Sequence, residues 1–351
     1  MILPQTFFGA LLLLLLTLFC WGSWANTFKL AGKWRFELYY FDFAFGVLLA
    51  AVVCAFTLGS QPTADGLEFL DDIAHTGRRQ AVYGFAAGAI FNLANMLFMA
   101  AISVAGLAVA FPVGLGTALF VGTLVNYAVQ PKGNTVLLFS GVAIVAASIV
   151  ADALAYRSHA RAKLEEEIGK AGRTKSKKKK DGSLKAIILC VASGVLMGSY
   201  FPLIDLAKAG DNGMGPYSVG LVFAAGVFAS TFLLNLFLMN LPVQGQAVEI
   251  LDYFKGRATQ HLLGLLGGAL WFSGMISSLV VAAAVAKDAQ IGPAAGLALR
   301  QGATMIGALW GLLVWKEFQN ADVRVKTLII LTLVLFVSGL GMISIAPLYS
   351  R

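Results

Sequence analysis

Charged residues are scarce in this sequence. They make up 13% of its 351 residues, whereas hydrophobic residues make up 58%. A soluble domain is nearer to half apolar and about a quarter charged. The shortage of charge therefore excludes a disordered chain, a nucleic-acid-binding module and an ordinary soluble enzyme. Such a chain divides into membrane spans rather than into soluble domains.

Motifs for nucleotide binding, hydrolysis and metal binding are also missing. The sequence contains no G-x-x-x-x-G-K-[ST], no H-E-x-x-H and no G-x-S-x-G. Its histidines are few and far apart, and its cysteines lie in apolar runs without a C-x-x-C pair: His75, His159, His261, Cys20, Cys54 and Cys190. We therefore expect no enzyme, no catalytic residue, no cofactor, no disulfide framework and no metal site.

The positive charge of the chain is concentrated in one segment. Between Arg157 and Lys185 there are 11 Lys/Arg and 4 Asp/Glu, which together supply seven of the eight net positive charges. In an apolar chain, a cluster such as Lys177 to Lys180 marks a cytoplasmic loop more often than a nucleic-acid site. We predict a basic cytoplasmic linker over 157–183. The 157–185 loop either enforces topology or also binds anionic lipid headgroups.

Ten apolar segments are long enough to cross a bilayer as helices, which takes about 20 residues each. They span roughly 7–26, 39–59, 82–103, 105–128, 135–156, 184–205, 217–241, 260–286, 291–315 and 326–347. The first segment has no basic region before it and no small-residue cleavage site after it, so we expect a retained helix. The predicted fold class is an all-α integral membrane protein with ten transmembrane helices.

Basic residues favour one side of the membrane. If the linker is cytoplasmic and the spans alternate, 19 of the 26 Lys/Arg lie on the cytoplasmic side and six on the opposite side. This bias predicts that both termini lie outside the cell. We expect a multi-pass protein of the cell membrane, meaning a plasma membrane or a bacterial inner membrane.

The two halves of the sequence resemble each other. Gly22-Ser23-Trp24 in the first span has a counterpart in Gly198-Ser199-Tyr200 of the sixth, and Gly88 of the third span has one in Gly268 of the eighth. Because each half holds five spans, the halves would have opposite topology, as in many secondary transporters. Chance similarity between Gly-rich apolar segments is the alternative. The predicted domains are an inverted five-helix repeat at 1–156, the linker at 157–183 and a second repeat at 184–351.

Arg300 is the most costly residue of the chain, because it lies near the middle of the ninth predicted span. A charge at the bilayer centre costs roughly 2.5–3.5 kcal/mol on insertion scales. Arg300 either faces the solute or forms an ion pair that holds two helices together. Its neighbour Gln301 offers both donors and acceptors, which suits an uncharged polar solute. We assign both residues to substrate binding.

Two carboxylates are candidate proton-coupling residues. Asp42 opens the second span, where partial burial would favour its protonated form. Its other readings are a helix N-terminal carboxylate and a partner for Arg35. Asp205 ends the sixth span after Pro202, where a broken helix could expose backbone groups to a cavity. A capping residue at the outer face is the alternative for Asp205.

The remaining candidates for substrate binding are amides and aromatic rings. Asn92 and Asn95 are three residues apart in the third span, so they share one helix face. They could bind a ligand or join two helices. Trp24, Tyr40 and Tyr200 lie near the repeated Gly-Ser pairs. They could stack on a flat ring or a sugar, or form an interfacial belt.

Glycine and proline mark the fourth and ninth spans. Both are rich in glycine and begin with a segment that contains proline, Pro112 or Pro293. Glycine lets helices approach one another closely. We therefore expect these two helices to line the transport pathway.

Several of these residues, taken in order, resemble the motifs of one superfamily. They are Gly22-Ser23-Trp24, Tyr40-Phe41-Asp42-Phe43, Asn95, Gly122-Thr123-Leu124-Val125-Asn126-Tyr127, and Gln301 followed by Trp310-Gly311. The chain resembles the drug/metabolite transporter superfamily over nearly its whole length, and within it the ureide permease and glucose/ribose porter branches. The resemblance implies ten helices, outside termini and a basic cytoplasmic loop after the fifth helix.

The same resemblance carries expectations about activity. The ureide permease branch implies proton-coupled transport of flat, uncharged heterocycles such as allantoin and uracil, and the porter branch implies sugar uptake. The chain departs from the plant ureide permeases at Arg300, where an apolar residue is expected, and at Lys316-Glu317, which replaces a Gly-Glu. The added Arg300 could change the substrate or replace the role of the coupling ion.

The leading hypothesis is therefore a secondary transporter that imports a small polar, mostly neutral solute with protons. A nucleobase or ureide comes first and a sugar second. The alternatives are an exporter of drugs or metabolites and a non-transporting membrane receptor. Export of lipophilic cations needs a membrane carboxylate and an aromatic cage, and Arg300 disfavours it because its positive charge repels cations. The expected partners are the solute and membrane lipid, with no nucleic acid, in a monomer or a dimer.

Overall fold

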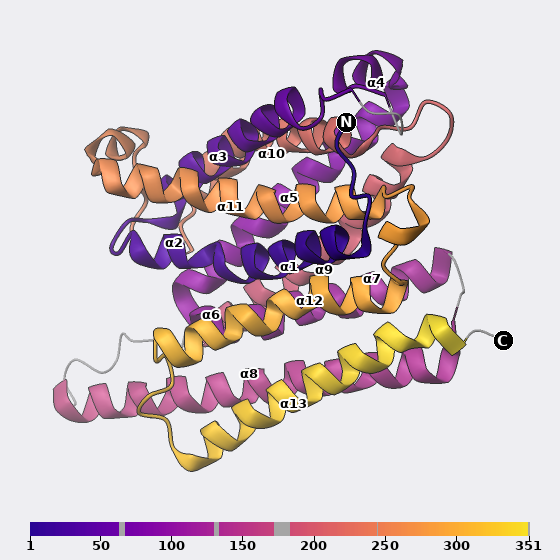
Figure 1. Cartoon of the computed structure of the whole chain (residues 1–351). Coiled ribbons are helices and arrows are strands. Elements are labelled where there is room, and N and C mark those ends of the chain that lie inside the picture. Colours follow the sequence, from indigo (N-terminus) through magenta and orange to yellow (C-terminus); the bar gives the residue numbers. More distant parts are fainter. Residues whose placement is uncertain (63–66, 130–132, 172–182, 244, 350–351) are drawn as a thin grey trace. The chain divides into compact units, whose positions relative to one another are not determined.

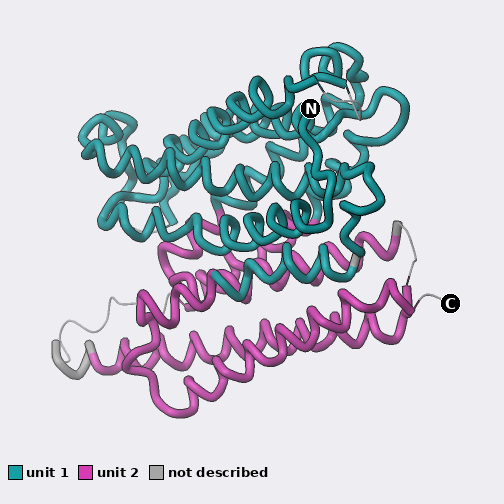
Figure 2. The backbone as a smooth tube through the Cα atoms, in the orientation of Figure 1, with its two compact units in different colours: residues 1–96, 199–306 teal, residues 97–198, 307–351 magenta. Residues whose placement is uncertain are grey.

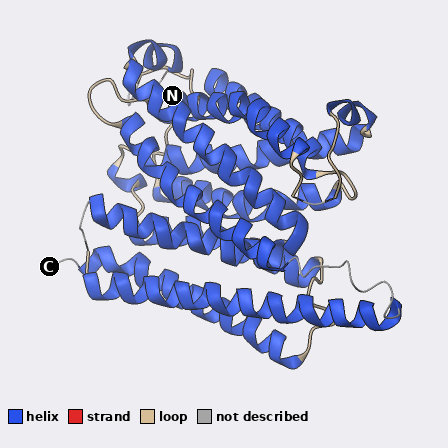
Figure 3. Cartoon of the chain, turned by 180° about the vertical axis from the view of Figure 1, so that it is seen from behind, coloured by secondary structure: helices blue, strands red, loops and turns tan. Residues whose placement is uncertain are grey.

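A computed structural model describes residues 1–62, 67–129, 133–171, 183–243 and 245–349 of the chain. Every regular element in these ranges is a helix (Figures 1 and 3). Ten described segments are long and apolar enough to cross a membrane: Phe7–Leu30, Phe36–Thr57, Arg78–Ala105, Leu107–Ala128, Thr135–Glu166, Ser183–Lys208, Pro216–Asn240, Ala258–Ala282, Lys287–Val314 and Val323–Tyr349. The predicted all-α, ten-span fold class is confirmed, while the inverted repeat stays a prediction.

Side-chain caps fix the start of two of these helices. Thr6 precedes α1 (Phe7–Ser23), and its hydroxyl accepts a hydrogen bond of 3.2 Å from the backbone N–H of Gly9. Asp322 precedes α13 (Val323–Ile345), and its carboxylate accepts one of 2.7 Å from Val325. Each cap satisfies an N–H group that has no partner inside its own helix, which sets where the helix begins.

The fifth helix is longer than its apolar segment. The sequence predicted a span over 135–156 followed by a linker, but α8 continues without interruption as Thr135–Ala171. The first part of the predicted 157–183 linker is therefore helical, because it is rich in Ala, Lys, Glu and Arg, all strong helix formers. The lysine cluster Lys177 to Lys180 lies outside the described residues.

Residues 1–96 and 199–306 form one compact unit, drawn in teal in Figure 2. It contains α1, α2 (Ala25–Leu30), α3 (Phe36–Thr57), α4 (Phe69–His75), most of α5 (Arg78–Ala105), the end of α9 (Ser183–Lys208), α10 (Pro216–Asn240), η3 (Ile250–Lys255), α11 (Ala258–Ala282), η4 (Lys287–Ala289) and most of α12 (Pro293–Leu309). Helix α3 packs against α10 and α11, and α1 packs against α11. We call this unit 1.

Two glycines allow α3 and α11 to cross closely. A Cβ atom on Gly46 would collide with the backbone of Leu265, and one on Gly268 would collide with the carbonyl oxygen of Phe43. Only glycine leaves the two backbones room to approach to this extent. The crossing brings the start of α3 alongside the start of α11, and this positions the residues described below.

Residues 97–198 and 307–351 form the second compact unit, drawn in magenta in Figure 2. It contains the end of α5, α6 (Leu107–Ala110), η1 (Phe111–Leu115), α7 (Gly116–Val129), α8, the first part of α9, η5 (Trp310–Val314), α13 and η6 (Ala346–Tyr349). Helix α8 packs along α13, and the Ser148 hydroxyl donates to the carbonyl oxygen of Thr332 at 2.9 Å. We call this unit 2.

Helices are interrupted or distorted at Gly106 and in the fourth and ninth spans, but not at Pro202, the one break that the sequence suggested. Gly106 has a positive φ of 85° and separates α5 from α6, which is a conformation that glycine adopts without strain. The segments η1 and η5 are π-helical turns in the fourth and ninth spans, and η1 contains Pro112. The break considered after Pro202 is absent, because α9 continues through it to Lys208.

Candidate functional site

Asp42 lies at the centre of a polar cluster in unit 1. The side chain is buried, with 4% exposure. The Tyr253 hydroxyl donates a hydrogen bond of 2.5 Å to its Oδ1 atom, and Nδ1 of His261 lies 2.8 Å from its Oδ2 atom. The three side chains come from α3, η3 and the first turn of α11. The cluster therefore joins two titratable groups and a phenol donor in an apolar region.

The aromatic surroundings of this cluster fix the histidine ring. The edge of the Trp34 ring meets His261 at 5.6 Å between centroids, and the Tyr253 ring meets it at 4.6 Å. Burial raises the pKa of Tyr253, and its hydrogen bond to Asp42 raises it further. The phenol thus stays protonated near neutral pH and remains a donor to the carboxylate. While Asp42 is ionised, it accepts hydrogen bonds from both partners.

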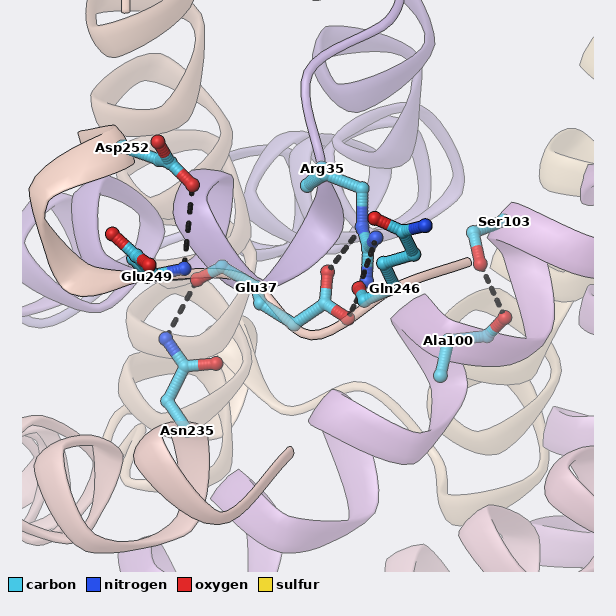
Figure 4. Close-up of polar contacts among 8 residues, drawn as sticks. All are labelled: Arg35, Glu37, Ala100, Ser103, Asn235, Gln246, Glu249 and Asp252. Atoms are coloured by element: carbon cyan, nitrogen blue, oxygen red, sulfur yellow. Dashed lines mark hydrogen bonds and ion pairs between the residues drawn. The ribbon is translucent and has the colours of Figure 1, made fainter. Parts of the chain in front are cut away.

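Arg35 does not pair with Asp42 but with Glu37, as Figure 4 shows. The guanidinium donates to both carboxylate oxygens of Glu37, at 3.1 Å and 2.6 Å, and to the carbonyl oxygen of Gln246 at 3.0 Å. Since α3 begins at Phe36, Glu37 is the acid in its first turn and Asp42 lies in the second. Glu37, rather than Asp42, is therefore the carboxylate that complements the helix dipole and pairs with Arg35. These were two of the alternatives that the sequence left open for Asp42.

The start of α3 is tied to α10 as well. The Asn235 amide nitrogen donates to the backbone carbonyl of Glu37 at 2.6 Å (Figure 4). The Asn235 side chain is fully buried, and its Oδ1 atom has no hydrogen-bond partner among the described residues. The segment that joins α10 to α11 is thus held to α3 through Gln246 and Tyr253, beside the cluster at Asp42.

Tyr40 and Asn95 form a buried pair between α3 and α5. Both side chains have 0% exposure, and the Asn95 amide nitrogen donates to the Tyr40 hydroxyl at 3.1 Å. That hydroxyl donates onward to the backbone carbonyl of Asn92 at 3.5 Å. The Oδ1 atom of Asn95 has no partner in the described part of the chain. An amide oxygen of this kind is an acceptor available to a ligand N–H or O–H group.

Asn92 differs from Asn95 in its bonding. Its amide nitrogen donates to the hydroxyls of Ser230 and Thr231, at 2.8 Å and 3.1 Å, and its Oδ1 atom accepts from Thr231 at 3.3 Å. All of these partners lie on α10. Asn92 therefore joins α5 to α10, the second of the two roles that its sequence position left open.

Arg300 and Gln301 lie on α12, and both are partly buried. The Arg300 guanidinium lies over Gly296, one turn earlier, and interacts electrostatically with Asp205. Within the described ranges, it forms no ion pair shorter than 4.0 Å and no side-chain hydrogen bond. Asp205 is exposed in the last turns of α9. The described contacts do not join Arg300 or Gln301 to the Tyr40–Asn95 pair.

The aromatic candidates are packed against other rings. Trp24 is buried and packs against Phe43 at 5.0 Å between centroids, and Phe43 in turn packs against Tyr40 at 5.2 Å. Tyr200 stacks on Phe201 at 4.4 Å and meets the edge of Phe91. Trp24 thus lies one ring away from the Tyr40–Asn95 pair, while Tyr200 belongs to a separate aromatic group.

Sequence reasoning missed Tyr253 and His261. They lie 211 and 219 residues from Asp42 along the chain, and neither belongs to a recognisable motif. His261 was noted as an isolated histidine at a span edge. The one signal in the sequence was the position of His261 near the start of a glycine-rich span. That this span crosses the second span closely is visible only in the three-dimensional structure.

The chain resembles the ureide permeases. A family model described as "Ureide permease" matches residues 39–189, a range that includes Tyr40, Asp42 and Asn95. Ureide permease 1 and ureide permease 2 of Arabidopsis thaliana are each 23% identical to it, and each alignment covers 95% of this chain and 96% of the relative. Ureide permease 4 of the same plant is 22% identical with the same coverage.

A solved crystal structure shares the fold. It covers 95% of this chain and 96% of its own, with a TM-score of 0.50 and 14% sequence identity. At that identity the likeness concerns the fold alone. The similarity to ureide permeases over nearly the full length, together with the ten apolar helices, shows a multi-pass membrane protein.

Proposed function

We propose that the chain is a secondary transporter that imports a small polar, mostly neutral solute of the ureide or nucleobase kind, driven by protons. The similarity to ureide permeases supports a transporter rather than an enzyme. The observation that carries the choice of solute is the Oδ1 atom of Asn95, which has no partner among the described residues and is buried beside the Tyr40 hydroxyl. A ureide or nucleobase presents amide N–H groups, which a buried carbonyl acceptor binds well.

The other candidates are proposed to complete the substrate site, three of them from positions that the described contacts do not join to this pair. Trp24, through Phe43, gives the Tyr40 ring an aromatic backing suited to a flat heterocycle. Asn92 positions the helix that carries Asn95 by bonding to α10. Arg300 and Gln301 supply donors that no other described side chain uses. Tyr200 supplies an aromatic ring from the same unit. Alternating access moves the two five-helix repeats around the bound solute.

The proposed coupling group is Asp42, with Asp205 as the second carboxylate. Proton binding to Asp42 neutralises a buried charge and leaves one oxygen unable to accept, so it weakens the contact with His261 or Tyr253. Those contacts tie the segment between α10 and α11 to α3. Protonation of Asp42 would thus release the segment between α10 and α11 from α3. The movement of that segment would couple proton binding to movement of the solute.

Uptake into proteoliposomes tests the function directly. Purified protein would be reconstituted and offered labelled uracil, allantoin and glucose, with and without an inward proton gradient. Gradient-driven accumulation of uracil or allantoin supports the proposal. Accumulation of glucose alone transfers the protein to the sugar branch, and efflux against the gradient supports an exporter. Binding without flux would leave a receptor as the better description.

A further inference from the structure

Unit 2 contains a second group of buried titratable residues, separate from the cluster at Asp42. Asp152 lies on α8 inside the fifth span, with 1% exposure. His159, seven residues later on the same helix, is also buried, with 7% exposure. Residues seven apart lie on the same face of a helix, about two turns from one another. Glu317 follows η5 and interacts with both residues.

Glu317 is fixed in place by backbone donors. Its Oε1 atom accepts a hydrogen bond of 3.0 Å from the N–H of Leu107, and its Oε2 atom accepts one of 2.8 Å from that of Ala108. Gly106 leaves room for the carboxylate, because a Cβ atom there would collide with it. These two N–H donors hold the carboxylate of Glu317, and with it a negative charge, in a fixed position.

Asp152 shows no such pair of backbone donors in the described part of the chain. Its Oδ2 atom is buried and has no hydrogen-bond partner within the described residues. It faces the negative charge of Glu317, and the Cys190 thiol of α9 is close enough to interact with it electrostatically. An ionised carboxylate without a donor is costly in an apolar interior, and a second negative charge nearby adds to the cost. The neutral, protonated acid is the stable form at this position.

The other elements that pack against α8 bring little positive charge to Asp152. Segments α6 and η1 contain no titratable residue. The titratable residues of the remaining neighbours are Lys185 and Cys190 in the first part of α9, Tyr127 of α7, Tyr349 of η6, and Arg324 and Lys326 in the first turn of α13. Asp322 and Lys163 act on His159 rather than on Asp152. The group that most affects the charge of Asp152 is thus Glu317.

His159 lies on the same face of α8, about two turns beyond Asp152. Its Nε2 atom is buried without a partner in the described ranges, and its ring packs on Phe318 at 4.9 Å between centroids. The imidazole also contacts the backbone of Glu317. Glu317 thus touches the surroundings of both Asp152 and His159, which lie toward the middle and the end of the same membrane-spanning helix.

We propose that Asp152 is a second proton-binding site of the chain, with Glu317 as the fixed counter-group and His159 as the neighbouring acceptor. The ligand is one proton: it binds to a carboxylate oxygen of Asp152, it changes the charge there from −1 to zero, and no other bond forms or breaks. A lone carboxyl without further oxygen ligands is suited to a proton rather than to a metal cation. Only the use of this site in solute movement rests on the proposed function; the binding of the proton does not.

Infrared difference spectroscopy on the purified full-length protein tests proton binding without any transport. The wild type is expected to show, at neutral pH, the carbonyl stretching band of a protonated carboxylic acid that is missing in Asp152→Asn. Asp152→Glu should keep a band at a shifted frequency, and Asp288→Asn, at an exposed carboxylate with no proposed role, should leave the band unchanged. In Glu317→Gln the band should disappear at lower pH than in the wild type, because the opposing charge is gone.

A solute exchange assay measures whether protonation of Asp152 affects transport. Exchange by the wild type should fall as pH rises and Asp152 loses its proton, whereas Asp152→Asn, which stays neutral, should keep its exchange rate at alkaline pH. The proposal is overturned if Asp152→Asn retains the band, or if the wild type lacks it. A band change produced by sodium rather than by pH would also overturn it, in favour of a cation site. Loss of exchange in every variant with the band intact would instead count against the proposed transport function.

Discussion

Two acids in unit 1 provide a matched pair for proton coupling. Asp42 is buried and bonded to Tyr253 and His261, whereas Asp205 is exposed. In Asp42→Asn we expect exchange of solute across the membrane to continue and gradient-driven accumulation to fall at least about tenfold, because the proton-binding group is gone. Uptake and counterflow assays on the same proteoliposomes measure both. Asp205→Asn should lose less, and equal losses in both variants would show that coupling does not depend chiefly on the buried acid.

Tyr253 is expected to set the pH range of the proposed proton coupling. Its raised pKa keeps it a donor, and a donor stabilises the ionised form of Asp42. Tyr253→Phe removes that stabilisation, so Asp42 should keep its proton to a higher pH. The midpoint of gradient-driven uptake against pH is expected to move upward. A midpoint that moves downward, or does not move, contradicts the assignment of Asp42 as the coupling group.

The two asparagines of α5 separate binding from stability. Asn95→Ala removes an acceptor that nothing else in the described chain uses, together with the donor to the Tyr40 hydroxyl, so KM should rise about two- to tenfold, the equivalent of about 0.5–1.5 kcal/mol. Asn92→Ala breaks the bonds to α10 and should lower the free energy of unfolding by about 1–3 kcal/mol. Solute titrations and thermal unfolding in detergent distinguish the two. An unchanged KM in Asn95→Ala would remove this residue from the substrate site.

At the scale of elements, the crossing of α3 and α11 depends on the absence of side chains. Gly268→Ala places a methyl group against the carbonyl of Phe43, so the helices must separate. Overpacking of this kind costs about 1–3 kcal/mol. Gly341→Ala on α13 is the control, because a Cβ atom there meets nothing within 4 Å. Thermal unfolding of the two variants should differ, and the same unfolding temperature in both would mean that the crossing tolerates a wider spacing.

The elements themselves were predictable to different extents. The ten spans were found because a stretch of apolar residues long enough to cross a bilayer is a local property of the sequence. The end of α8 was missed because the apolar run ends at the first charged residues, near Arg157. The residues that follow are still good helix formers, and the helix continues to Ala171. The break after Pro202 was expected from proline alone, and α9 accommodates it.

The site was less predictable than the fold. Asp42, Tyr40 and Asn95 were identified from polarity inside apolar runs, but Tyr253 and His261 are ordinary residues at segment ends. Only tertiary packing brings them to Asp42. Asp152 was overlooked for another reason: it stands in an apolar run near the end of the predicted fifth span, and its lack of a donor is a property of its surroundings. The repeat similarity and the roles of the candidate residues stay predictions.

For the molecule as a whole, the distribution of basic residues makes a prediction about topology. A short epitope at either terminus should be accessible to antibody on intact cells. One inserted within 172–182 should be accessible only after the membrane is permeabilised, because 19 of the 26 Lys/Arg lie on that side of the predicted spans. The reverse labelling pattern would invert the predicted orientation and with it the expected direction of proton-driven import.

The hydrogen bonds of Asp42 have a consequence for the synthesis of the chain. The partner of Glu37 is Arg35, two residues earlier in the chain, so the charge of Glu37 is compensated as α3 emerges from the ribosome. Asp42 has to wait for Tyr253, 211 residues later, which at roughly 5–20 residues per second is about 10–40 s of translation. During that interval the second span enters the membrane with an uncompensated acid, and insertion is easiest if that acid carries a proton. Asp42, the group proposed to take up protons during transport, would thus first bind a proton while the chain is being inserted into the membrane.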